Sequence, residues 1–239
     1  FILASSLIVG FIGLGLVYWS EYNLLRQTIS RDYMAMARLL GGAMDRIISR
    51  EIKSTEVFMS SSERLQKVQE YNLRYVGMSN ESKEAYFKDM DQRWLKAVNN
   101  DPLIVEYTGS LVGMRLNELA QDDPSISEIF ITDKYGGLVA ASNRTIDFYM
   151  ADEEWWQKSF AQGKGDVFLD RIGFDSCIPK VSLSLAIVIP IRNKSKEVIG
   201  VCKNILEINR LFLPLETFSI GKGGHVVLID KQGYMIFHP

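Results

Sequence analysis

The stretch SEIFITDKYGGLVAAS, at residues 127–142, contains an apolar run, then Asp-Lys-X-Gly, then a second apolar run. The same order returns in GHVVLIDKQGYMIFHP, at residues 224–239, so that Asp133 corresponds to Asp230. Short apolar runs on either side of a glycine-containing turn are typical of a β-hairpin, because glycine supplies a positive φ. We therefore predict a strand–turn–strand unit at both places. The alternative is two unrelated hairpins that share a common turn sequence.

Downstream of the first copy, the sequence predicts an antiparallel sheet interrupted by one helix. The helix is expected in ADEEWWQKSFAQG, with Asp152 as its N-cap and Gly163 as its stop signal. Further strands are expected at residues 166–170, 180–191 and 197–208. Consecutive strands joined by short loops favour antiparallel pairing, so we predict an α+β domain with flanking helices.

The chain begins with an uncharged stretch, and an aromatic cluster of Tyr18, Trp19 and Tyr22 closes it. About 20 apolar residues match a bilayer core of ~30 Å, and aromatic rings favour the membrane interface. We therefore predict a transmembrane helix over residues 1–21. A signal peptide or a buried helix is the alternative, although a signal peptide has a shorter apolar region and a small-residue cleavage site.

The region between this stretch and the first strand reads as helix. From residue 22 to about residue 64, apolar residues recur every three to five positions, and no proline occurs before Pro102. A further helix is expected from about residue 104 to residue 120. The apolar stripe of the long helix needs a partner, which is either the sheet or the same helix in a second subunit.

Four segments together resemble one known family. They are IFITDKYGGLVAAS, DEEWWQKSFAQGKGDVFLD, VSLSLAIVIPIRNKSKEVIGVCKNIL and GKGGHVVLIDKQGYMIFHP, and they follow an apolar helix and a long helix. In this layout the chain resembles the double Cache sensors of bacterial and archaeal receptors. The resemblance implies two PAS-like sheets stacked on the long helix, with a small ligand in the membrane-distal one. It also implies a cytoplasmic histidine kinase, chemotaxis transducer or cyclic-nucleotide enzyme beyond a second membrane helix.

The resemblance implies a division of the chain into four parts. These are a transmembrane helix over 1–21, a stalk helix and helical segment over 22–127, a distal PAS-like domain over 128–216, and the first hairpin of a proximal PAS-like domain over 217–239. A lone hairpin cannot bury a core. We therefore expect the chain to be part of a longer receptor of the inner or plasma membrane, with the residues after about 21 outside the cytoplasm.

The resemblance also places the ligand beneath SNRTIDFYMADEEWWQKSF. Trp155 and Trp156 match an aromatic pair of the family, and we expect one ring to line the site while the other packs or lies at its rim. Tyr149 or Phe148 lies near an upstream tyrosine position of the family. Family members that bind amino acids carry an arginine two residues before the pair, whereas this chain has Glu153. The sequence therefore predicts that this carboxylate-binding arginine is lost.

The remaining candidate residues concern charge. Asp170 lies near the position where the family places an acid for the ligand amine, and Asp175 is the alternative for that role. Arg144 or Arg171 could bind an anion from a different direction. An acidic, aromatic site favours amine-like or amino-acid-like ligands over simple carboxylates, because amines pair with carboxylates and cations lie on aromatic faces.

Composition disfavours other classes of function. The net charge is −2 and basic residues form no stripe, so we expect no nucleic-acid partner. Two histidines and two cysteines, without the spacing of metal ligands, predict neither a metal site nor a disulfide. We find no nucleophile–base pattern and expect no catalysis or cofactor in this chain, although an output domain elsewhere could be a kinase or cyclase. The alternative function is a ligand-free, membrane-anchored domain that dimerises through the long helix, and a homodimer is expected in either case.

Overall fold

The computed structural model describes residues 2–170, 172–174, 183–208, 212–216, 218–220, 224–230 and 232–238. Within these ranges, the structure does not describe the side chains of residues 2–10, 174, 214, 216, 219 and 220. Arg171, Asp175 and Cys177, which the sequence analysis singled out, lie outside the described residues.

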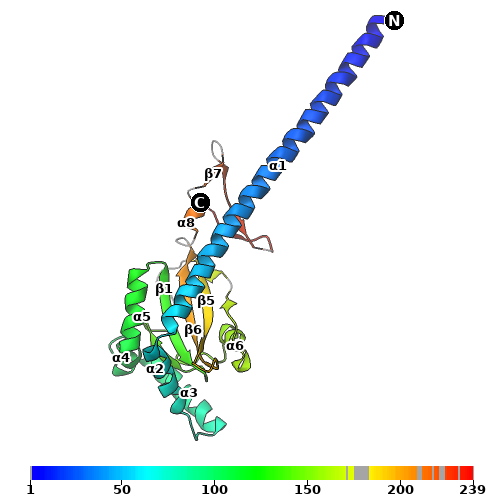
Figure 1. Cartoon of the computed structure of the whole chain (residues 1–239). Coiled ribbons are helices and arrows are strands. Elements are labelled where there is room, and N and C mark those ends of the chain that lie inside the picture. The colour runs from blue at the N-terminus through cyan, green and yellow to red at the C-terminus, as the bar shows by residue number, and fades with distance from the viewer. Residues whose placement is uncertain are drawn as a thin grey trace. The chain divides into compact units, whose positions relative to one another are not determined.

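The chain divides into two compact units, Phe1–Arg46 and Ile47–Pro239. Helix α1 (Ile2–Met59) begins in the first unit and ends in the second (Figure 1). In the first unit its exposed side chains include the apolar residues Leu25, Ile29 and Tyr33. The long helix that the sequence predicts is thus confirmed.

In the part of the chain that the structure describes, no helix combines the length and the hydropathy that a membrane span requires. Residues 1–10, which are half of the predicted span, are among those whose side chains lie outside the description.

Four shorter helices follow α1, and two of them correct the sequence-based boundaries. The predicted helix to residue 64 ends at Met59, because Ser61 accepts a hydrogen bond from the Arg64 amide and starts a new helix. The predicted helix at 104–120 is divided at Gly109, since Ser110 caps the second part through the Gly113 amide. The four helices are α2 (Ser62–Leu73), α3 (Asn80–Lys96), α4 (Pro102–Thr108) and α5 (Leu111–Asp122).

The sheet is antiparallel throughout, as the sequence predicts. Its strands are β1 (Ile126–Asp133), β2 (Leu138–Ala141), β3 (Phe168–Leu169), β4 (Gly173–Phe174), β5 (Leu183–Arg192) and β6 (Val198–Glu207). They are ordered β2-β1-β6-β5-β3, and β4 also pairs with β5. The two long strands β5 and β6 join at a turn in which the Asn193 amide donates to the Glu197 carbonyl.

The two faces of the sheet carry different helices. One face of the sheet is covered by α1, α2 and α5. On this face, Asn204 of β6 donates a buried hydrogen bond to Thr55 of α1. On the other face the helix α6 (Glu154–Phe160) packs on β5 and β6. Figure 1 shows α6 on the side of the sheet opposite α2, α4 and α5. Because side chains alternate along a strand, Lys203 points to the α6 face and Asn204 to the α1 face.

Both copies of the repeated sequence form the same turn. In the first, Asp133 Oδ1 accepts hydrogen bonds from the amides of Tyr135 and Gly137. In the second, Asp230 Oδ1 accepts them from the amides of Gln232 and Tyr234. The corresponding glycines, Gly136 and Gly233, both have φ of 89°, where a side chain would be strained. The predicted strand–turn–strand unit is therefore confirmed at both places.

The second copy lies among short strands. Helix α8 (Leu213–Glu216) precedes β7 (Ser219–Ile220) and β8 (Gly224–His225), which pair with each other. The turn at Asp230 joins β9 (Leu228–Ile229) to β10 (Met235–Phe237). That this region opens a second PAS-like domain stays a prediction.

The pairing of β5 with β6 fixes the surroundings of Cys202. Cys202 of β6 lies directly opposite Ile189 of β5. Cys202 is a free, fully buried thiol, and burial raises its pKa.

Candidate ligand-binding site

Helix α6 presents its aromatic pair to the sheet. Its N-cap is Glu153 and not Asp152 as the sequence suggested, and Glu153 makes no side-chain capping bond. The helix ends where Ala161 takes a left-handed conformation, two residues before the predicted stop at Gly163. The seven-residue helix buries Trp155, Trp156 and Ser159.

Trp155 lies on an aromatic residue and a cation of the central strands. Its ring meets Phe130 of β1 edge-to-face, with centroids 5.9 Å apart. The ammonium group of Lys203 lies 4.6 Å from the Trp155 ring centroid, within the range of a cation–π interaction. Phe130 and Lys203 are direct cross-strand partners, so neighbouring strands place these groups together.

Trp156 has a packing role in the structure. Its Nε1–H donates a buried hydrogen bond of 2.9 Å to Thr132 Oγ1, which in turn donates to the Val201 carbonyl. Its ring stacks on Phe160 with centroids 4.7 Å apart. Of the two tryptophans, Trp155 is therefore the one beside the charged groups of the sheet, whereas Trp156 fastens α6 to β1.

Replacing Thr132 with valine is expected to destabilise the domain by about 1–3 kcal/mol, because the buried Trp156 Nε1–H loses its acceptor. Thr132→Ser retains the hydroxyl and should cost less. Urea denaturation of the two variants measures the difference. Equal stability of Thr132→Val and the unchanged protein would show that the hydrogen bond does not hold α6.

Carboxylates gather around the start of α6. Burial is the main cause of the raised pKa of Glu153, the Asp152 charge adds to it, and Lys203 acts in the opposite direction. Asp170, at the end of β3, also raises the pKa of Glu153. Burial, followed by the charges of Asp91 and Asp152, raises the pKa of Asp147. The α6 face therefore combines several carboxylates with the ammonium group of Lys203.

The structure brings some of the predicted site residues together. Asp170 is anchored by its amide, which donates to the Ala186 carbonyl of β5, and its charge acts on Glu153. Tyr149 stacks on Phe87 of α3, with ring centroids 4.7 Å apart. Arg144 donates from one nitrogen to the Trp94 and Leu95 carbonyls at the end of α3. Trp155, Trp156 and Asp170 are thus near the α6 face, while Arg144 and Tyr149 are tied to α3.

Two charged residues of this face were absent from the sequence-based candidates. Lys203 interrupts the apolar run VCKNIL, and Glu128 opens the apolar run EIFI. Glu128 is only 1% exposed and lies two residues from Phe130, which places both on the α6 face. A charged residue within an apolar strand was the sequence signal that could have identified each of them. The face to which such a side chain points depends on the register of the sheet.

Comparisons with known proteins bear on the fold. No family model matches the chain, and no curated protein matches it. Among solved structures, the chain has the fold of an extracellular sensor domain. The similar structure is the extracellular domain of vpHK1S-Z8, assigned as a histidine kinase. The two chains are 13% identical, and the match covers 89% of this chain and 71% of that one with a TM-score of 0.56. This similarity confirms the Cache-type resemblance at the level of the fold.

Two chemoreceptor domains are more distant. The sensory domain of Tlp3 from Campylobacter jejuni, with isoleucine bound, is 11% identical over 81% of this chain and 73% of that one, with a TM-score of 0.42. The ligand-binding domain of the amino-acid chemoreceptor PctC from Pseudomonas aeruginosa PAO1, in complex with GABA, is 14% identical over 66% and 67%, with a TM-score of 0.40. Of these three structures, the extracellular domain of vpHK1S-Z8 alone has a TM-score above 0.5.

Proposed function

We propose that this chain is the extracytoplasmic ligand-sensing part of a membrane receptor. In this proposal a small molecule binds between α6 and the sheet, beside Trp155 and Lys203. The observation that carries it is the juxtaposition of Lys203 on the sheet with Trp155 and Glu153 of the facing helix α6 and its N-cap. Buried charges are costly unless they have partners, so a face that holds both signs is suited to a polar ligand. The similarity in fold to an extracellular sensor domain supports the same conclusion.

The charges on this face favour a ligand that carries an ammonium group. Glu153 and Asp170 supply acceptors, and Trp155 and Phe130 supply aromatic faces for a cation. The sequence predicts that the family's carboxylate-binding arginine is lost, and Lys203 supplies a cation on this face in its stead. An amino-acid-like zwitterion, with its carboxylate toward Lys203, uses both kinds of charge.

The signal is proposed to pass through the central strand β6 to α1. Lys203 lies on the α6 face, and the next residue, Asn204, donates to Thr55 of α1 over 3.1 Å on the opposite face. A ligand shifts an equilibrium only by its different affinity for the two states. A displacement of β6 that accompanies ligand binding would therefore change the position or pairing of α1.

The remaining parts of the proposal concern anchoring and assembly. The uncharged residues 1–21 are proposed as the membrane anchor. The exposed apolar side chains of α1, among them Leu25 and Ile29, are proposed to pair with the same helix of a second copy. The output domain is proposed to lie elsewhere in the protein.

A ligand screen tests the proposed function. Thermal shift and calorimetry of the chain are performed with L-amino acids and GABA as zwitterions, with putrescine as an amine, and with malate and citrate as carboxylates. We expect stabilisation by one or more ammonium-bearing compounds. Stabilisation by malate or citrate alone would contradict the ligand class, and no stabilisation by any member of the panel would contradict the sensing role for these classes of compound.

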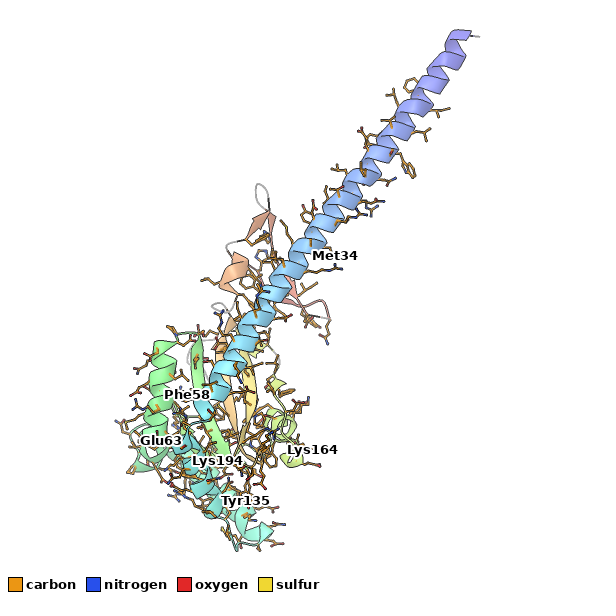
Figure 2. All side chains as sticks on the ribbon, in the orientation of Figure 1. Met34, Phe58, Glu63, Tyr135, Lys164 and Lys194 are labelled. Carbon is orange, nitrogen blue, oxygen red and sulfur yellow. The ribbon has the colours of Figure 1, made fainter. Side chains whose placement is uncertain are left out.

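Lys203→Ala is expected to weaken binding of a carboxylate-bearing member of the panel about 10- to 100-fold, because a charge-assisted hydrogen bond is lost. Lys194→Ala removes the same charge from the exposed turn between β5 and β6 (Figure 2), and this variant should bind normally. Calorimetry measures both variants. Equal weakening in both would mean that only the overall charge matters.

A further inference from the structure

Helix α3 presents one face to the segment that leads into α6. Phe87, Asp91 and Trp94 are spaced by four and three residues, which places them on the same side of a helix. The segment at residues 143–151 connects β2 to the loop before α6. The Tyr149 ring stacks on Phe87, and Trp94 Nε1–H donates to the Thr145 carbonyl over 2.8 Å. The connecting segment therefore contacts α3 at both of its ends.

Asp91 makes the central contact between α3 and this segment. Its Oδ1 accepts hydrogen bonds of 2.9 Å from the amides of both Phe148 and Tyr149. Two successive amides that point at one carboxylate oxygen fix the direction of the chain at this point. Phe148 is fully buried, and its ring packs against Trp94.

The other backbone groups of the segment bind the turn between β1 and β2. The Phe148 carbonyl accepts from the Leu138 amide over 3.0 Å, and the Met150 amide donates to the Gly136 carbonyl over 2.9 Å. The segment is therefore held between the sheet edge and α3, and Asp91 supplies the acceptor on the α3 side. Trp155 follows Tyr149 by six residues, so the position of this segment determines where α6 begins.

We propose that Asp91 is a positioning residue for the ligand site. Through the Phe148 and Tyr149 amides it sets the start of α6, and thereby the position of Trp155 over Lys203. The importance of this for sensing rests on the proposed function, whereas the positioning is measured without a ligand. Helix α3 then belongs to the sensing machinery, although none of its residues is among those that surround Trp155 and Lys203.

The role of Asp91 as an acceptor can be separated from its charge. The Asp91 charge disfavours ionisation of the neighbouring Asp147, whose pKa is raised mainly by burial. Asp91→Asn keeps an acceptor oxygen and removes this repulsion, whereas Asp91→Ala removes the acceptor. Asp89→Ala is the matched control, because Asp89 lies on the same helix with a side chain that is 66% exposed and pairs only with Arg93 among the described contacts.

Hydrogen exchange of the full chain, followed by mass spectrometry, tests the proposal. In Asp91→Ala we expect peptides within residues 144–156 to exchange about 10-fold faster, because the Phe148 and Tyr149 amides lose their acceptor. Exchange in β5 and β6 should not change. Asp91→Asn and Asp89→Ala should exchange within about twofold of the unchanged protein. Unaltered exchange in Asp91→Ala, or equally fast exchange in Asp91→Asn, would overturn the proposal.

A second measurement distinguishes positioning of α6 from local packing on α3. Fluorotryptophan is incorporated, and the Trp155 resonance is assigned with Trp155→Phe. We expect this resonance to shift in Asp91→Ala and to remain in place in Asp91→Asn and Asp89→Ala. A Trp155 resonance that does not move in Asp91→Ala would limit Asp91 to packing and would refute the proposal. Should Asp91→Ala fail to fold, Phe87→Leu, which removes the Tyr149 stack, is expected to give the same localised exchange, and its absence would count against the proposal.

Discussion

Trp94→Ala is expected to lower the free energy of unfolding by about 3–5 kcal/mol, since truncation of a buried aromatic residue removes its packing and leaves a cavity. Trp94 is fully buried, and its ring meets Tyr107 edge-to-face at 5.6 Å. The loss also leaves the buried Thr145 carbonyl without its hydrogen bond from Trp94 Nε1–H. This residue joins α3, α4 and the segment before α6, so several contacts disappear together.

Urea denaturation followed by circular dichroism measures the effect of Trp94→Ala. The control is Trp19→Ala in the first unit, because Trp19 is 66% exposed and its truncation should cost less than about 0.5 kcal/mol. A cost below about 1 kcal/mol for Trp94→Ala would mean that the site collapses around the smaller residue and that α3 is not held by this ring.

The second large effect concerns Asp133, whose side chain is buried at the first turn. Oδ1 accepts from the Tyr135 and Gly137 amides, and Oδ2 lies beside the Tyr75 hydroxyl. Burial raises the pKa of Asp133 from 3.8 to about 7, and the hydrogen bonds that it accepts lower it in part. The folded protein therefore holds a proton on Asp133 at pH values where the unfolded chain has lost it.

The sign of the pH dependence follows from this difference. The stabilisation from the bound proton is complete below the unfolded pKa of 3.8 and is lost as the pH rises through about 7. Between these values, Asp133 should lower the free energy of unfolding by about 1.4 kcal/mol per pH unit. Asp133→Asn cannot ionise and keeps an acceptor for the turn, so this variant should lack the Asp133 contribution to the slope.

Urea denaturation at several pH values between 4 and 8 compares Asp133→Asn with the unchanged protein. Asp230→Asn is the control, because Asp230 makes the same turn in the second copy but is only partly buried. We expect Asp230→Asn to retain the slope of the unchanged protein. If Asp133→Asn and the unchanged protein show parallel pH profiles, Asp133 is ionised in the folded state across this range.

Local patterns predicted the turns and most of the elements. The Asp-X-X-Gly turns depend on one carboxylate and one glycine within five residues, so Asp133 and Asp230 could be interpreted without knowledge of the fold. Helix boundaries were less accurate, because Ser61 and Ser110 start new helices by capping amides three residues away. A serine in a helical pattern is compatible with continuation or with a new N-cap, and packing decides between them.

The candidate site could be predicted only in part. The aromatic pair at Trp155 and Trp156 was identified, but both lie on the sheet side of α6, and a hydrogen bond to Thr132 distinguishes their roles. Arg144 was a candidate for anion binding because of its charge, yet it donates to the carbonyl groups at the end of α3. Lys203 was missed, since its proximity to Trp155 requires the pairing of β6 with β1 and the packing of α6 on that face.

Local sequence patterns were enough to predict the repeated turn, the long helix, the antiparallel α+β class and an aromatic, acidic segment before and within α6. These features depend on residues that are close along the chain, so periodicity, capping and turn chemistry are sufficient to predict them. Packing between distant segments determines which tryptophan lies beside Lys203, where α3 contacts the segment before α6, and which of the two turns buries its carboxylate. Each of these depends on residues that are distant in sequence, because strand register and helix packing determine which side chains meet and how much water reaches them.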